Sequence, residues 1–332
     1  MRHYIIKTIC FISPFLLILI SYFFTDPYKV LYQYDNYYPT DGTPKYIDLN
    51  RSMVTVETFI ANNSKYHYDS FIFGNSRSGL YRIGDWKKYI GEDASCFHMD
   101  EYGGSIYMID KKIRYITQKT TIKNAIICLD DWTLSTFSPQ ETNLHRCPPV
   151  LNEYRNVVKF HLGYIADYFS PYFFPQYWSW RLTGRVFPYA KDVISEKAFY
   201  WNYETNECQR DSEVYQDNCW IDSEIFSVED FSGDCERYDD LISREVEMLL
   251  RDISEILNSQ RADYYVIINP TLSRKKLSIN DISILNEIYG DRLYDFSGNN
   301  IITRDSTLFL DDNHFNSNVA AKIMEIVYSQ NN

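Results

Sequence analysis

Short apolar runs alternate with helical stripes along most of the chain, and this alternation constrains the fold more than any other feature. Residues 68–73, 95–99, 124–129 and 264–269 are typical of buried strands, and residues 292–296 form a shorter piece of the same kind. Strands that alternate with helices favour a parallel sheet with helices on both faces. The sequence therefore predicts an α/β fold whose functional loops follow the carboxyl ends of the strands.

The helical stripes lie between these runs. Ile106, Ile109, Ile113 and Ile116 recur at helical spacing, and Ser105 is placed to cap that helix. Further helices are predicted near 53–61, over 242–256, over 282–288 and over 319–326.

The amino-terminal residues 4–24 are almost entirely apolar, with Lys7 as their only charge. As a helix this segment measures about 31 Å, enough to cross a hydrocarbon core of about 30 Å. Basic Arg2 and Lys7 precede the fully uncharged part of the run, Thr8 to Phe24, and Asp26 follows it, which predicts that the amino terminus lies in the cytoplasm and the rest of the chain outside. A cleaved signal peptide is the alternative, but no small-x-small cleavage site follows Phe24, which favours a retained anchor.

Two other regions depart from the alternation. Residues 26–50 contain prolines and no apolar period, so we expect an extended stalk that leaves the membrane. Residues 132–237 form an insertion whose aromatic run, SPYFFPQYWSW at 170–180, either packs against the main sheet or offers a platform for glycans. The predicted organisation is an anchor (1–25), a stalk (26–50), a main domain (51–131 and 238–332) and the insertion (132–237).

Charge excludes one class of partner. The chain has 45 acidic and 33 basic residues, and its net charge of −12 would repel a nucleic-acid backbone. We therefore expect no nucleic-acid partner.

The cysteines permit disulfides in an exported domain and give little support to a zinc site. Six lie outside the anchor, and an even number in an exported domain permits disulfides, most plausibly among Cys147, Cys208, Cys219 and Cys235, with the pairing open. A metal-dependent phosphoesterase using His98, Asp130 and Asp131 is conceivable, but no paired ligand spacing supports it. We expect neither a metal nor another cofactor.

Polar residues collect where three predicted strands end and before the last helix. Asn75 and Ser76 follow the first strand, Gly103-Gly104 the second and Asp130-Asp131 the third, while Asp311 and His314 precede the final helix. A serine nucleophile needs an exposed turn, an imidazole to take its proton and a carboxylate to orient the imidazole. Each motif alone is weak, but their joint order favours Ser76 as nucleophile, His314 as base and Asp311 as orienting group.

These motifs resemble the blocks of the SGNH (GDSL-type) hydrolase superfamily. FIFGNSRS matches the nucleophile block, Gly103-Gly104 the glycine block and Asp311 with His314 the closing Asp-x-x-His, over roughly residues 66–130 and 238–328. The resemblance implies a three-layer SGNH/flavodoxin-like sandwich with a mostly parallel sheet. It also implies an oxyanion hole made by the backbone N–H groups of Ser76 and of Gly103 or Gly104. An α/β-hydrolase fits less well, because Ser78 stands where its Gly-x-Ser-x-Gly elbow has glycine.

The sequence departs from the family pattern in two of its blocks. Asn75 stands where the family usually has aspartate, and Asp130-Asp131 stand where its third block supplies an asparagine to the oxyanion hole. A carboxylate beside a developing oxyanion repels it. Asp130 and Asp131 must therefore point elsewhere or be protonated, or hydrolytic efficiency is lost.

An anchored domain with an altered third block resembles the membrane-anchored branch of this superfamily. That branch includes the D protein of teichoic-acid D-alanylation and acetyltransferases of exopolysaccharide assembly in the bacterial cell envelope. The resemblance implies acyl transfer or esterase chemistry on an envelope polysaccharide, beside a membrane-bound O-acyltransferase partner. The alternative is a non-catalytic SGNH-like module that binds glycan or that partner.

Overall fold

The computed structural model describes residues 1–39, 45–138, 140–152, 156–187, 193–196, 199–210 and 235–329. Its centre is a five-stranded sheet in the order β3-β2-β4-β8-β9. The pairings that join these strands are all parallel, which confirms the expected α/β fold with a mostly parallel sheet. The strands are β2 (Ser70–Gly74), β3 (Cys96–Asp100), β4 (Asn124–Leu129), β8 (Asp263–Ile268) and β9 (Leu293–Asp295).

The strand order creates a switch point between β2 and β4. From β2 the chain moves outward to β3, then returns across β2 to β4 and continues to β8 and β9 on the opposite side. In open α/β sheets the crevice outside the carboxyl ends of the strands at such a point is where ligands bind. Residues 75–77 and 130–131 follow the two strands that flank it.

Two apolar clusters cover opposite sides of the sheet. Phe71 and Phe73 of β2 belong to one cluster and Ile72 to the other, because successive side chains of a strand point to opposite faces. The first cluster contains residues of α2 (Arg51–Tyr66), α4 (Ile106–Thr117), α9 (Arg244–Ser259) and α10 (Ile279–Tyr289). The second contains residues of α3 (Ile83–Ile90), α11 (Ile301–Arg304) and α12 (Ser317–Ser329).

The helix boundaries show what the apolar stripes missed. Ser105 caps α4 as predicted, since its side chain accepts the N–H of Met108. Helix α2 is longer than the predicted 53–61, because Asn50 caps its start and the helix continues to Tyr66.

The described residues also form several short elements. These are α5 (Asp131–Ser135), β1 (Tyr46–Ile47), β5 (Ile194–Ser195), β6 (Phe199–Trp201), β7 (Cys208–Arg210) and the 3₁₀ turns η1 (Ser78–Leu80), η2 (Pro149–Leu151), η6 (Gly290–Arg292) and η7 (Ser306–Leu308).

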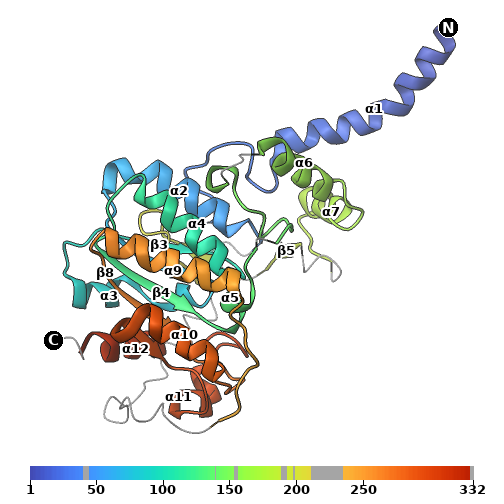
Figure 1. Ribbon diagram of the computed structural model, residues 1–332. Coiled ribbons are helices and arrows are strands. Elements are labelled where there is room, and N and C mark those ends of the chain that lie inside the picture. Colours follow the sequence, from blue (N-terminus) through green and yellow to red (C-terminus); the bar gives the residue numbers. More distant parts are fainter. Residues whose placement is uncertain are drawn as a thin grey trace.

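The amino-terminal helix α1 (Arg2–Thr25) projects away from this body (Figure 1). An 18-residue stretch within His3–Thr25 has a mean hydropathy of 2.1, and by length and composition the helix can cross a membrane. Figure 1 shows α6 (Val157–Tyr168) and α7 (Phe174–Thr183) beside the end of α1 that joins the body.

The segment predicted as an extended stalk is instead packed against the body. Tyr28 and Val30 are buried in a cluster with residues of α6 and α7. Tyr37 and Tyr38 are buried beside Trp201, and β1 pairs with β5 of the insertion. Aromatic side chains that bury one at a time leave no helical or strand period, so the sequence pattern gave no sign of this packing.

The described part of the insertion shows where the aromatic run packs and whether its cysteines pair with one another. The aromatic run 170–180 packs on the end of α1 and on residues 28–31 rather than on the main sheet, and Trp178 Nε1 donates to the Tyr168 hydroxyl at 2.9 Å. No disulfide joins Cys147, Cys208 and Cys235 to one another, and Cys219 lies outside the described residues.

Candidate active site

The turn after β2 presents Ser76 at the carboxyl edge of the sheet. The strand ends at Gly74, where an added Cβ would lie 2.7 Å from Ser78 Cβ and 2.9 Å from Cys128 Cβ, so no side chain fits there. The chain then turns tightly, with the N–H of Ser78 donating to the Asn75 carbonyl at 3.0 Å. Asn75 and Arg77 are buried, whereas Ser76 between them is half-buried.

The three residues predicted as a triad meet in space. Ser76 Oγ lies 2.7 Å from His314 Nε2, although 238 positions separate them in the chain. His314 Nδ1 lies 2.8 and 2.9 Å from the two carboxylate oxygens of Asp311. This is the chain of contacts by which a carboxylate orients an imidazole and the imidazole activates a hydroxyl.

The Asp311 carboxylate is stabilised in its ionised form. Burial alone would raise its pKa, but hydrogen bonds from the backbone N–H of Asn313 and from His314 outweigh it, and the pKa of Asp311 lies below its usual value. An ionised Asp311 accepts the Nδ1 proton of a neutral imidazole. Nε2 is then left as the acceptor that faces the Ser76 hydroxyl.

Asp130 is neutralised by partners and does not stand as a free charge at the site. It is buried, one carboxylate oxygen accepts from Asn75 Nδ2 at 2.6 Å, and the same oxygen forms an ion pair with the Arg77 guanidinium. The other oxygen caps α5 by accepting the N–H of Thr133 at 2.8 Å. The sequence left three possibilities for Asp130: that it points elsewhere, that it is protonated, or that hydrolytic efficiency is lost. The structure shows that its carboxylate points to Asn75, Arg77 and Thr133.

Its neighbour Asp131 lies at the edge of the same group. Asp131 Oδ1 is 3.6 Å from the Arg77 guanidinium. Burial and the adjacent Asp130 raise the pKa of Asp131, and Arg77 opposes that rise. The Arg77 guanidinium therefore lies near both carboxylates that follow β4.

Arg77 is the residue that sequence reasoning missed. Besides Asp130, its guanidinium reaches Asn313 in the loop of residues 311–314, called here the histidine loop. Arg77 Nε donates to the Asn313 carbonyl at 2.7 Å and Nη2 donates to Asn313 Oδ1 at 3.2 Å. One side chain thus ties the turn of residues 75–78, which carries Ser76, to the end of β4 and to the loop that carries His314. The available signal was an arginine directly after the nucleophile in a chain whose third strand ends in two acids.

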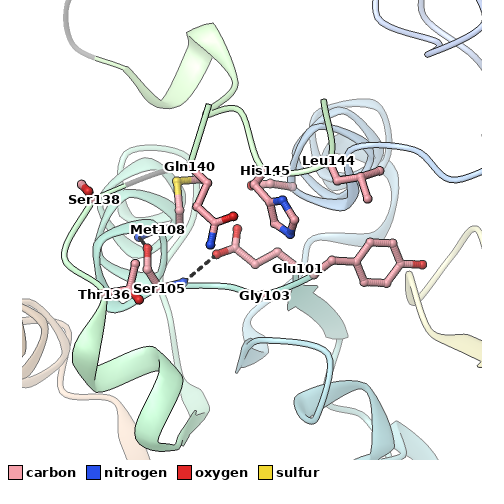
Figure 2. A pocket seen from close by; sticks show the side chains of 11 residues that line it. Glu101, Gly103, Ser105, Met108, Thr136, Ser138, Gln140, Leu144 and His145 are labelled. Carbon is pink, nitrogen blue, oxygen red and sulfur yellow. Dashed lines mark hydrogen bonds between the residues drawn. The ribbon is translucent and has the colours of Figure 1, made fainter. Parts of the chain in front are cut away.

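The two glycines after β3 occupy a crowded loop, shown in Figure 2. Gly103 has a φ of +52°, its carbonyl accepts from Trp132 Nε1 at 2.9 Å, and a Cβ there would lie 3.1 Å from His145 Nε2. A Cβ on Gly104 would lie 2.4 Å from Glu101 Cγ. Glycine is thus favoured at 103 by the left-handed backbone and at 104 by the close Glu101 side chain. The part of either glycine in an oxyanion hole stays a prediction.

Glu101 itself is held by a buried ion pair. One of its oxygens lies 2.9 Å from Lys112 Nζ, and the other accepts the N–H of Ser105 at 3.2 Å. The loop that carries the glycines is thus fixed to the N-cap residue of α4 and to Lys112 within that helix.

The residues of the phosphoesterase alternative do not assemble into a metal site. His98 is buried in β3 with Nε2 2.8 Å from the Tyr81 carbonyl oxygen, while Asp130 is paired with Arg77. Within the described ranges, no group of three or more His, Cys, Asp or Glu side chains is placed to hold a metal ion.

Comparison with known proteins adds no relative. The chain matches no protein-family model, and no curated protein matches its sequence. The resemblance to SGNH hydrolases therefore rests on the motifs and their order.

Proposed function

We propose that this protein transfers an acyl group through a covalent ester on Ser76, as an O-acyltransferase or an esterase. The observation that carries the proposal is the continuous contact from Ser76 Oγ through His314 to Asp311. The site also lies at the switch point of the sheet, between the carboxyl ends of β2 and β4.

The first half of the reaction would acylate the enzyme. Ser76 Oγ attacks the carbonyl carbon of the acyl donor while His314 Nε2 takes the hydroxyl proton. The tetrahedral intermediate then collapses, the bond to the leaving group breaks, and His314 gives its proton to that group. Backbone N–H groups of Ser76 and of Gly103 or Gly104 would stabilise the oxyanion.

The second half would release the acyl group. A glycan hydroxyl, or water in an esterase, loses its proton to His314 and attacks the ester carbonyl. The Ser76–acyl bond breaks and Ser76 regains a proton from His314. Arg77 supports both halves by holding the nucleophile turn and the histidine loop together and by neutralising Asp130.

The finer fold and location belong to the same proposal. When the five strands are renumbered in chain order, the sheet has the order 2-1-3-4-5, which is the flavodoxin-like order. Each of its two faces packs against helices through one apolar cluster. These features support an SGNH-type three-layer sandwich. With α1 as a single span of the bacterial cytoplasmic membrane and its amino terminus inside, the domain would act on an envelope polysaccharide beside a membrane-bound O-acyltransferase.

The proposal is tested by acylating the full-length protein in lipid nanodiscs. An activated acetyl ester should leave one acetyl group on the peptide that contains Ser76, followed by turnover to water or to an added glycan. Ser76→Ala should abolish both, whereas Ser306→Ala, an exposed serine before the histidine loop, should leave both unchanged. Absence of any adduct on Ser76, with glycan binding intact in Ser76→Ala, would instead identify a non-catalytic binding module.

A further inference from the structure

The end of α1 is joined rigidly to the body of the protein. Ser21 Oγ lies 2.6 Å from the Tyr168 hydroxyl, and the buried Tyr22 ring packs on the Tyr168 ring with centroids 5.3 Å apart. The buried Asp26 carboxylate then accepts the N–H groups of Val30 and Leu31, both at 3.0 Å. The depth of α1 in a membrane therefore sets the position of α6.

The apolar surface of α1 continues to the turn that contacts α6. Phe23 and Phe24 remain 45% and 85% exposed, one and two residues beyond Tyr22. At about 1.5 Å per residue, Ser21 and Phe24 differ by about 4.5 Å along the helix axis. A bilayer that covers Phe24 therefore reaches the level at which α6 packs on α1.

Helix α6 is apolar on two opposite faces. Phe160, Tyr164 and Tyr168 are buried against α1, α7 and residues 28–30. On the other face Val158 is 68% exposed and Leu162 is 58% exposed, four positions apart on one stripe. Globular proteins normally make the outward face of such a helix polar, whereas on α6 Val158 and Leu162 are exposed on that face, with Lys159 between them.

Helix α7 adds the composition of a membrane-surface segment. Leu182 is 77% exposed, directly after the exposed Arg181, and Arg185 is exposed just beyond the helix. Trp178 and Trp180 are partly buried in the same cluster. Tryptophans and basic side chains beside exposed apolar residues are typical of segments that lie in the headgroup region of a bilayer.

We propose that α6 and α7 form a membrane-surface platform, with Val158, Leu162 and Leu182 inserted among the lipids around the end of α1. The occupant of this apolar surface is lipid, because α6 packs on the end of α1 through Tyr168, and Phe23 and Phe24 at that end of α1 are exposed apolar side chains. The platform would fix the orientation of the body relative to the membrane. This proposal does not depend on the chemistry of Ser76.

The direct test is site-specific photo-crosslinking of the full-length protein in phosphatidylethanolamine–phosphatidylglycerol vesicles that contain alkyne-tagged lipid. A benzophenone amino acid replaces Val158, Leu162 or Leu182 in turn. The controls are Met248 and Ile279, which are 59% and 74% exposed on α9 and α10, away from α1 (Figure 1). We expect a several-fold excess of lipid adducts at the three platform positions over the two controls.

Three results would overturn the proposal. Equal lipid labelling at all five positions would show no preferred contact with the bilayer. Adducts between two copies of the chain at the platform positions, without lipid adducts, would make the surface a dimer interface. Adducts to another protein in native membranes, again without lipid adducts, would make it a partner site.

A second measurement does not depend on the crosslinker. The variant Val158→Asp, Leu162→Asp, Leu182→Asp should exchange the amide hydrogens of residues 157–183 several-fold faster than wild type in nanodiscs, with the same melting temperature in detergent. The matched variant Met248→Asp, Ile279→Asp should leave that exchange unchanged. Equal protection of α6 in nanodiscs and in detergent for the wild-type protein would contradict a lipid contact.

Discussion

Two buried charge networks lie at neighbouring strand ends and are built from the same residue types. After β3, Arg51 binds Asp100 with two hydrogen bonds, of 2.9 and 3.0 Å, and also donates to the Asn206 carbonyl. After β2 and β4, Arg77 pairs with Asp130, which Asn75 also contacts. Each network is therefore centred on one buried pair of an arginine and an aspartate, with asparagine residues as further partners.

The two networks differ in what lies at their outer edge. Arg51 is fully buried, and its network joins α2 to β3 and to the insertion through Asn206. The Arg77 network ends instead at Asn313, next to the half-buried His314 and beside Ser76. A buried ion pair at a strand end is thus not by itself a sign of chemistry. The sign is a nucleophile and an imidazole placed beside it within reach of solvent.

The largest expected difference between the two networks is in activity. Ser76→Ala should lower acyl transfer by about 10⁴-fold or more, because the nucleophile is lost. It should change the free energy of unfolding by less than about 0.5 kcal/mol, since the removed hydroxyl is partly exposed. Activity assays and denaturant unfolding measure the two effects. Transfer that survives the substitution would place the chemistry elsewhere in the chain.

The network around Arg51 should show the reverse behaviour. Arg51→Ala leaves the Asp100 carboxylate buried without its partner and should cost about 3–5 kcal/mol of unfolding free energy. The fraction that stays folded should keep its rate of acylation at Ser76. Lys88→Ala, which breaks an exposed ion pair with Asp85, serves as the control and should cost less than about 1 kcal/mol. Equal costs for the two variants would contradict the contrast between the networks.

The next effect concerns Asn75 and Asp130. At these two positions the SGNH pattern has an aspartate and an asparagine, the reverse of this chain. Asn75→Asp places a second carboxylate against Asp130 and should destabilise the fold. Adding Asp130→Asn restores one amide and one carboxylate, and should recover most of the loss with a coupling energy of about 1–3 kcal/mol. Unfolding of the wild type, both single variants and the double variant gives this value. Additive costs would show that the two side chains do not interact.

The smallest effect is the pH dependence that Asp311 contributes. Its pKa is lowered in the folded protein, so its stabilising contribution is present above the ordinary aspartate pKa of about 3.9 and is lost as the pH falls through the lowered value. The difference in unfolding free energy between wild type and Asp311→Asn should therefore shrink on going from about pH 7 to about pH 3. A difference that stays constant over this range would show that the hydrogen bonds to Asp311 do not favour its ionised form.

Much of the fold and of the triad follows from local sequence pattern. The run 124–129 coincides with β4, and the stripe from Ile106 to Ile116 lies within α4, because burial leaves a period that sequence records. Ser76, Asp311 and His314 were placed by their positions relative to strands and to the last helix. The structure brings them together because parallel strands end at one edge of the sheet.

The remaining features depend on contacts between distant segments. Neither the strand order nor the partners of Arg77 have a local signature, since the arginine meets Asp130 and Asn313 only after folding. Residues 26–50 looked like a stalk because their tyrosines bury without periodicity. Cys147 and Cys235 are free cysteines in the described part of the chain, and an even cysteine count does not by itself place sulfur atoms close to one another.

The most direct test of the central claim is reaction of the full-length protein with a fluorophosphonate, which phosphonylates a serine only when that serine is activated. The account predicts one adduct, on Ser76, whose rate of formation falls by about 10²–10⁴-fold in His314→Gln, because the imidazole no longer removes the hydroxyl proton. No adduct, an adduct on another serine, or labelling of Ser76 at an undiminished rate in His314→Gln would contradict it.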